Sequence, residues 1–146
     1  MNLLLCVALA AGAPGVKDPP KDATIVGSWR FESLSINGVV VPNTKGGDAD
    51  VITFKADGTY ATTRKKFEKP EPDTGGTYKV DAKKSPAEID VTSTIGGKDR
   101  PTPGIFKIDG DTLTICTADD ARPTRFESVV GGKTSILMTL KRVKKE

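Results

Sequence analysis

Residues that could catalyse a reaction are scarce in this sequence. Histidine is absent from its 146 residues, which removes the side chain most often used as a general base or metal ligand. A hydrolase would then need paired carboxylates, and we expect Glu88 and Asp90 to point to opposite faces of one strand, where they cannot act together. Cys116 has no histidine to activate it, so we interpret it as a small buried residue. No catalytic residue is expected.

Acidic and glycine-containing motifs point to turns rather than to ligand sites. Asp109 and Asp111 flank Gly110, and two more acids stand at 119–120, but the spacing lacks the number of ligands that a calcium loop needs. The Asp-Gly pairs at 57–58 and 109–110 are followed by strand-like residues, whereas a phosphate-binding loop leads into a helix. We therefore expect no metal and no cofactor.

The charge balance does not indicate a nucleic-acid-binding protein, and we expect no nucleic-acid partner. There are 22 basic and 19 acidic residues, for a net charge of +3, and nucleic-acid binding needs a concentrated basic face. Two short basic clusters stand out, one at Arg64-Lys65-Lys66 and one at residues 141–145. Either cluster could contact an anionic component of a cell envelope, which remains an alternative partner.

The N-terminus has the character of an export signal. The first 16 residues carry no charge, Leu3–Leu9 is apolar, and Ala8-Leu9-Ala10 fits a cleavage site. We interpret residues 1–10 as a signal peptide, too short to be a transmembrane segment. Lipid attachment at Cys6 and a retained, disordered N-terminus are the alternatives. Residues 11–23 form a linker rich in proline, glycine and charge. We expect a periplasmic or extracellular location.

The elements that would position any site are short strands. Segments rich in Val, Ile, Thr, Phe and Tyr alternate with turn residues from residue 24 to residue 146. Asn37-Gly38 is a strong hairpin turn pair. We predict eight to nine strands within 27–36, 39–41, 50–55, 59–65, 76–80, 88–95, 104–108, 112–117, 122–128 (weak) and 135–142.

Alternation of apolar and polar residues supports these strands and suggests a barrel. Ile52 and Phe54 share one face, while Thr53 lies on the other. The first strand breaks the pattern between Phe31 and Leu34, which predicts a bulge near Ser33. A sheet of this many strands tends to close, because closure removes exposed edges. We predict an all-β, antiparallel, up-and-down barrel that is either filled or holds one small ligand.

Two motifs carry a resemblance to a known family. Gly27-Ser28-Trp29 opens the first long strand and Lys141-Arg142 ends the last, a combination that resembles lipocalin-like barrels. The resemblance implies that Gly27, Trp29 and Arg142 close one end of the barrel, with the basic side chain across the indole.

Residues 24–142 also resemble, more specifically, an uncharacterised domain family of planctomycete bacteria whose members are small exported proteins. The motifs that carry this likeness are the Ile36-Asn37-Gly38 turn with Val41-Pro42, residues 76–81, 85–90, 104–116, 122–126 and Leu140-Lys141-Arg142. The family implies no reaction.

Likeness to lipocalins implies a binding module for a small hydrophobic or anionic molecule. The candidate ligand-binding residues are Phe54, Tyr60, Tyr78, Phe106 and Arg125. Because Trp29 closes one end, we expect the site at the opposite end. Arg125 would either pair with Glu88 or Glu127 or meet an anionic ligand. We expect a monomer. The alternative is an interaction or structural module of the cell envelope that uses the charged stretch 64–73.

Overall fold

The computed structural model describes residues 24–41, 50–63, 75–95, 98–131 and 133–144. The predicted signal peptide (1–10), the linker (11–23) and the charged stretch 64–73 lie outside the described residues. Within the described ranges, no helix has the length and apolarity needed to cross a membrane.

Nine strands are found in the described part of the chain, and most match the predicted ranges. They are β1 (Gly27–Ile36), β2 (Val39–Val41), β3 (Val51–Phe54), β4 (Thr59–Thr63), β5 (Gly75–Asp81), β6 (Ala87–Ile95), β7 (Lys98–Asp109), β8 (Thr112–Ala118) and β9 (Ser135–Arg142).

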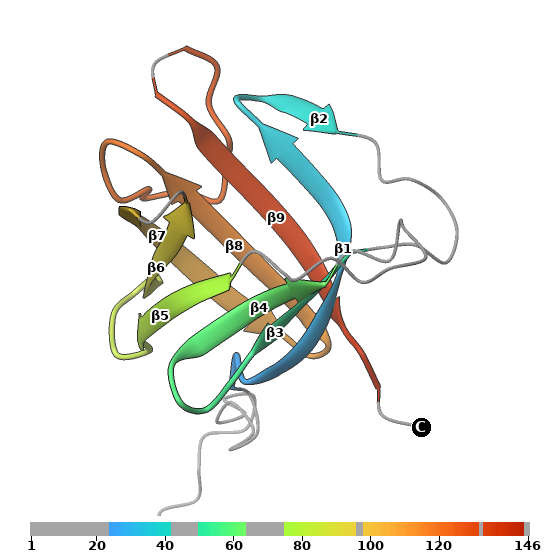
Figure 1. Cartoon of the computed structure of the whole chain (residues 1–146). Coiled ribbons are helices and arrows are strands. Elements are labelled where there is room, and N and C mark those ends of the chain that lie inside the picture. Colours follow the sequence, from blue (N-terminus) through green and yellow to red (C-terminus); the bar gives the residue numbers. More distant parts are fainter. Residues whose placement is uncertain (1–23, 42–49, 64–74, 96–97, 132, 145–146) are drawn as a thin grey trace, which may run out of the picture.

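Sheet topology confirms the predicted all-β, antiparallel, up-and-down barrel. The strand order is β2-β1-β3-β4-β5-β6-β7-β8-β9, and pairing of β1 with β9 closes eight of the strands into a barrel. The short β2 is the extra strand: it pairs with the end of β1 from Leu34 to Ile36, while β3 pairs with the start of β1 from Gly27 to Arg30. In Figure 1, β1 begins at the lower end of the barrel, which we call the Trp29 end.

The bulge within β1 and the hairpin turn after it both have the geometry that the sequence predicts. Asn37 and Gly38 both adopt positive φ, 51° and 79°, as a type I′ turn requires. The register of β1 against β9 shifts between Phe31 and Ser33, which confirms the predicted bulge. The shift places Leu34 on the same inner face as Phe31, because their β9 partners, Met138 and Leu140, are two residues apart.

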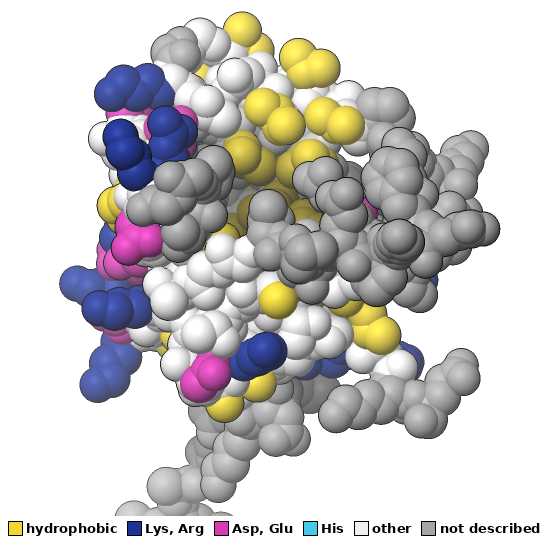
Figure 2. Space-filling view, in the orientation of Figure 1, with side chains coloured by type: hydrophobic (Ala, Val, Ile, Leu, Met, Phe, Trp, Pro, Cys, Tyr) yellow, Lys and Arg dark blue, Asp and Glu magenta, His cyan; other side chains and the backbone are white. Residues whose placement is uncertain are grey.

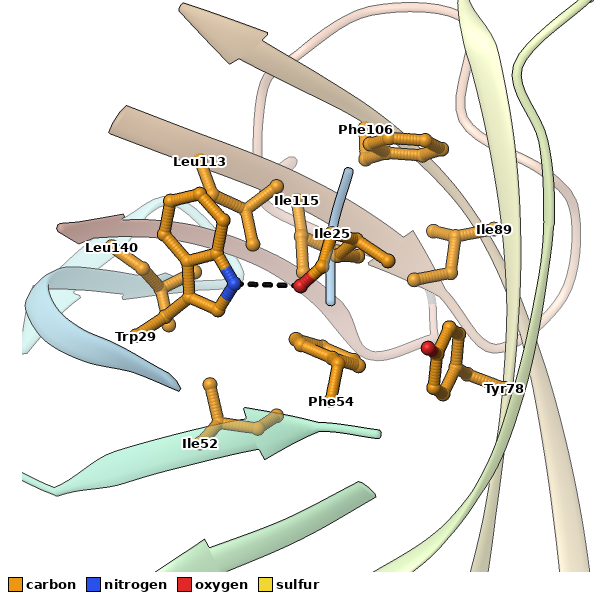
Figure 3. Packing of buried hydrophobic residues seen from close by; sticks show 10 residues of the cluster. All are labelled: Ile25, Trp29, Ile52, Phe54, Tyr78, Ile89, Phe106, Leu113, Ile115 and Leu140. Atoms are coloured by element: carbon orange, nitrogen blue, oxygen red, sulfur yellow. Dashed lines mark hydrogen bonds between the residues drawn. The ribbon is translucent and has the colours of Figure 1, made fainter. Parts of the chain in front are cut away.

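A cluster of buried hydrophobic residues surrounds Trp29 inside the barrel (Figure 3). Trp29 is fully buried, and the Phe54 and Tyr78 rings meet edge to face at 4.9 Å. Such pairs add about 0.5–1.5 kcal/mol to the burial of their area. The buried cluster comprises Ile25, Trp29, Ile52, Phe54, Tyr78, Ile89, Phe106, Leu113, Ile115 and Leu140.

Two predicted strands differ from the structure. The segment 122–128 is not a strand: it belongs to the long β8–β9 connection, where Pro123 lacks a backbone donor and the Arg122 side chain binds to β6 and β7 instead. Strand β7 begins at Lys98 rather than at 104. Pro101 and Pro103 are tolerated because residues 98–103 pair with β6 alone.

Candidate functional site

Trp29 and Arg142 together hold the segment that leads into β1. The Arg142 guanidinium lies 4.1 Å from the centre of the Trp29 ring. The Trp29 indole N–H donates to the carbonyl of Ile25 at 2.7 Å (Figure 3), and Arg142 donates to the carbonyls of Thr24 at 3.1 Å and Val26 at 3.3 Å. The pair therefore fixes residues 24–26 across the Trp29 end.

Gly27 makes this arrangement possible. Its φ is +132°, and a Cβ atom there would lie 3.0 Å from a guanidinium nitrogen of Arg142. A larger residue would strain the backbone and push the guanidinium off the indole.

A cavity of about 760 Å³ lies beside this segment, at the same end of the barrel. Its walls come from residues 24–26, the β3–β4 turn, the β5–β6 connection and the end of β7. It is open to solvent on one side. The lining residues are Thr24, Ile25, Val26, Ala56, Gly58, Tyr78, Val80, Ala82, Pro86, Ala87, Phe106, Lys107, Ile108 and Phe126.

Small side chains explain why space remains there. Ala56, Gly58, Ala82 and Ala87 all face the cavity, whereas the β1 and β9 side of the same end is filled by Trp29 and the other large core residues. Protein interiors are normally close-packed. Small residues from separate elements on one side of the barrel therefore leave space that a bound molecule could fill.

The cavity wall is mainly apolar. The hydroxyl of its one tyrosine is already hydrogen-bonded within the protein. The Tyr78 hydroxyl donates to the carbonyl of Lys55 at 2.6 Å. Burial raises the pKa of Tyr78, and the negative charge of Asp57 raises it further. The phenol is therefore neutral at physiological pH and serves as a fixed part of the wall.

Four of the five predicted ligand-binding residues lie together. Tyr78 and Phe106 line the cavity. Phe54 is 1% exposed behind Tyr78, and Tyr60 is half-buried with its ring 5.9 Å from that of Phe54. Burial raises the pKa of Tyr60.

Arg125 lies apart from these aromatic residues. It is exposed in the β8–β9 connection, where it lines a polar crevice of about 360 Å³ together with Arg122, Glu127 and Lys133. The structure thus does not bring the predicted basic residue to the aromatic group.

The cavity also lies at the Trp29 end, although the sequence led us to expect a site at the opposite end. Trp29 and Arg142 fill only the part of this end near β1 and β9, so the part bounded by β5 and β7 stays open. Towards the opposite end, the inward side chains of Phe31, Leu34 and Met138 are half-buried. Figure 2 shows hydrophobic side chains gathered over the upper parts of β1, β2 and β9.

Arg122 is a key residue that the sequence did not single out. Its guanidinium donates to the carbonyls of Gly104 at 2.7 Å and Ile89 at 3.3 Å, and to the Asp90 carboxylate at 2.6 Å. Its Nε lies 3.6 Å from the Glu88 carboxylate. The expectation that Glu88 and Asp90 lie on opposite faces is wrong, because alternate residues of a strand share a face.

Beneath the same connection, Cys116 is a buried free thiol, as the sequence suggested. It lies on the outward side of β8 and donates to the carbonyl of Glu127 at 3.3 Å. Burial raises the pKa of this thiol, which lowers the fraction of reactive thiolate. The arrangement is that of a packing residue and not of a nucleophile.

Metal-binding geometry is not found in the described part of the chain, where no three His, Cys, Asp or Glu side chains gather in a way that could hold an ion.

Comparison with known families agrees with this architecture. The family model for the lipocalin-like domain matches residues 25–130, which span the chain from the segment before β1 to the β8–β9 connection. No curated protein matches the chain.

Proposed function

Since the chain belongs to the family of lipocalin-like domains, we propose that it is an exported binding module that holds a small hydrophobic molecule in the cavity at the Trp29 end. The observation that carries the proposal is the cavity itself, walled mainly by apolar side chains beside the buried core cluster. Catalysis is not part of the proposal.

Size and surroundings of the cavity support binding. Its volume of about 760 Å³ falls within the roughly 300–1,000 Å³ typical of small-molecule sites. Val26 and Val80, two of its lining residues, are 39% and 44% exposed. Exposed apolar side chains grouped around a hollow are characteristic of surfaces that a ligand covers.

Export is supported by the sequence rather than by the fold. The uncharged, apolar start of the chain and the small residues at 8–10 fit a signal peptide. The likeness of residues 24–142 to exported planctomycete domains agrees with this. A periplasmic or extracellular binding protein would meet its ligand outside the cytoplasm.

Trp29 provides a direct assay, because it is the only tryptophan of the chain and bonds to Ile25 in the cavity wall. We expect N-phenylnaphthylamine to bind with energy transfer from Trp29. Ala87→Phe should weaken this binding about ten-fold or more, because the added ring occupies the cavity. Ala121→Phe, on the exposed surface of the β8–β9 connection, is the matched control and should bind as the unaltered protein does.

Circular dichroism establishes that both variants fold. Equal probe affinity in a folded Ala87→Phe variant and in the unaltered protein would exclude the cavity as the site. Absence of any probe binding to the unaltered protein would count against the binding function altogether.

A further inference from the structure

One charged side chain stands among the apolar residues that line the cavity. Lys107 belongs to β7 and is exposed at the cavity edge, next to Phe106 and Ile108. Its ammonium lies 4.8 Å from the centre of the Phe126 ring, and Phe126 is itself a lining residue. The contact holds the positive charge beside the mouth instead of leaving it free in solvent.

The positive charge of Lys107 is not neutralised locally. Within the described residues, Lys107 has no ion-pair partner, and the lining contains no carboxylate. On the adjacent strand β6, Glu88 is paired with Arg122. An anion at the mouth would therefore meet an unpaired cation at the edge of an apolar surface, where the attraction is screened less than in bulk water.

Apart from Lys107, the described lining carries two polar side chains, those of Thr24 and Tyr78, and neither is charged. The Tyr78 hydroxyl already donates to the Lys55 carbonyl, so its proton is not available to a neutral polar ligand. A cationic head at the mouth would be repelled by Lys107. Charge and polarity thus both favour a negative group outside and a hydrocarbon group inside.

We propose that the cavity takes a small amphiphile with one anionic head, the head bound by Lys107 and the apolar tail lying against Tyr78 and Phe106. This inference rests on the proposed binding function and adds the chemical class of the ligand. Lys107 then determines specificity, while the apolar wall supplies most of the affinity.

Calorimetric titration with three probes of equal chain length tests the assignment: decanoate, decanol and decylamine at neutral pH. We expect decanoate to bind about five-fold more tightly than decanol, the size of one partly exposed ion pair, and decylamine to bind most weakly. Lys107→Met should bring decanoate to the level of decanol and leave decanol unchanged. Lys107→Glu should reverse the order of decanoate and decylamine.

Lys133→Glu is the matched control, because it changes the net charge equally but lies on the β8–β9 connection, outside the cavity lining. Equal effects of the two Glu variants would overturn the role of Lys107, as would equal affinities of decanoate and decanol for the unaltered protein. If decanol binds in those cases, the hydrophobic site stands and only the anionic head is wrong. If none of the three probes binds, the proposed function fails as well.

Discussion

Trp29 and Arg142 influence the cavity through the backbone, although neither side chain lines it. Three hydrogen bonds from the pair end on residues 24–26, and these three residues form one wall of the cavity. The pair that closes the barrel near β1 and β9 thereby also sets the shape of the open part beside it. The proposed binding site therefore depends on contacts that also stabilise the barrel.

Replacing Arg142 should measure this anchoring. Arg142→Met removes the cation–π contact and two hydrogen bonds, so we expect the free energy of unfolding in urea to fall by about 1–3 kcal/mol. Lys141→Met, at the neighbouring position, should cost less than about 0.5 kcal/mol. Equal losses in the two variants would show that the contacts on residues 24–26 contribute little.

At the residue scale, the sequence indicated those side chains that sit in recognisable motifs. The roles of Gly27, Trp29 and Arg142 were inferred from a resemblance, and the burial of Cys116 from its place in an apolar run. The role of Arg122 could not be inferred, because it depends on the path of an irregular connection that brings its guanidinium 2.7 Å from the Gly104 carbonyl. Two arginines three residues apart looked alike in sequence, and only the fold separates Arg122, which is bound, from Arg125, which is exposed.

The β8–β9 connection is held on the outside of the barrel by a few polar contacts. Arg122 fixes it to β6 and β7, and the Ser128 hydroxyl fixes it to the β1–β2 hairpin through Ser35 at 2.6 Å and the Gly38 N–H at 2.9 Å. Cys116 lies beneath, bonded to Glu127. Thiol reactivity is therefore a measure of how often the connection opens.

Arg122→Met should loosen this connection without unfolding the barrel. In a Cys6→Ser background, where Cys116 is the only thiol, we expect its labelling by a thiol reagent to speed up about ten-fold or more, since local opening becomes easier. Arg125→Met removes an exposed arginine from the same connection but no hydrogen bond or ion pair to the described residues of β6 or β7, and should leave the rate unchanged. A labelling rate that Arg122→Met does not alter would mean that other contacts hold the connection closed.

At the element scale, regular strands were predictable because apolar residues alternate along them. Ile52 and Phe54 illustrate this, since both proved buried. The bulge near Ser33 was predictable for the same reason, from the break in alternation. The cavity was not predictable, because it depends on small residues such as Ala56 and Ala87 that come from separate elements and meet only in the fold.

The barrel interior also makes the stability of the whole molecule sensitive to alkali. Both tyrosines of the chain, Tyr60 and Tyr78, have a pKa raised above 10.0, chiefly by burial. Well below pH 10.0 both are protonated in the folded and the unfolded chain. As the pH rises further, the unfolded chain loses these protons first, so stability is lost as the pH passes through the folded-state pKa.

Thermal unfolding followed by circular dichroism should show this loss. We expect the midpoint to fall above about pH 10, accompanied by the absorbance of tyrosinate. Tyr60→Phe should reduce the fall, because it removes one buried ionisable group and breaks no hydrogen bond of the described residues. An identical fall in that variant would assign the alkaline transition to other groups.

Closure of the barrel by β1 and β9 has a consequence for how the protein is made. During synthesis β1 emerges before the other eight described strands, but it pairs with β9 along nearly its whole length, and β9 emerges after the other eight. Until it emerges, the sheet has two open edges, on β1 and β8, which can pair with other chains. The eight residues of β9 thus complete the barrel, and a chain interrupted before Ser135 would lack the strand that pairs with both open edges.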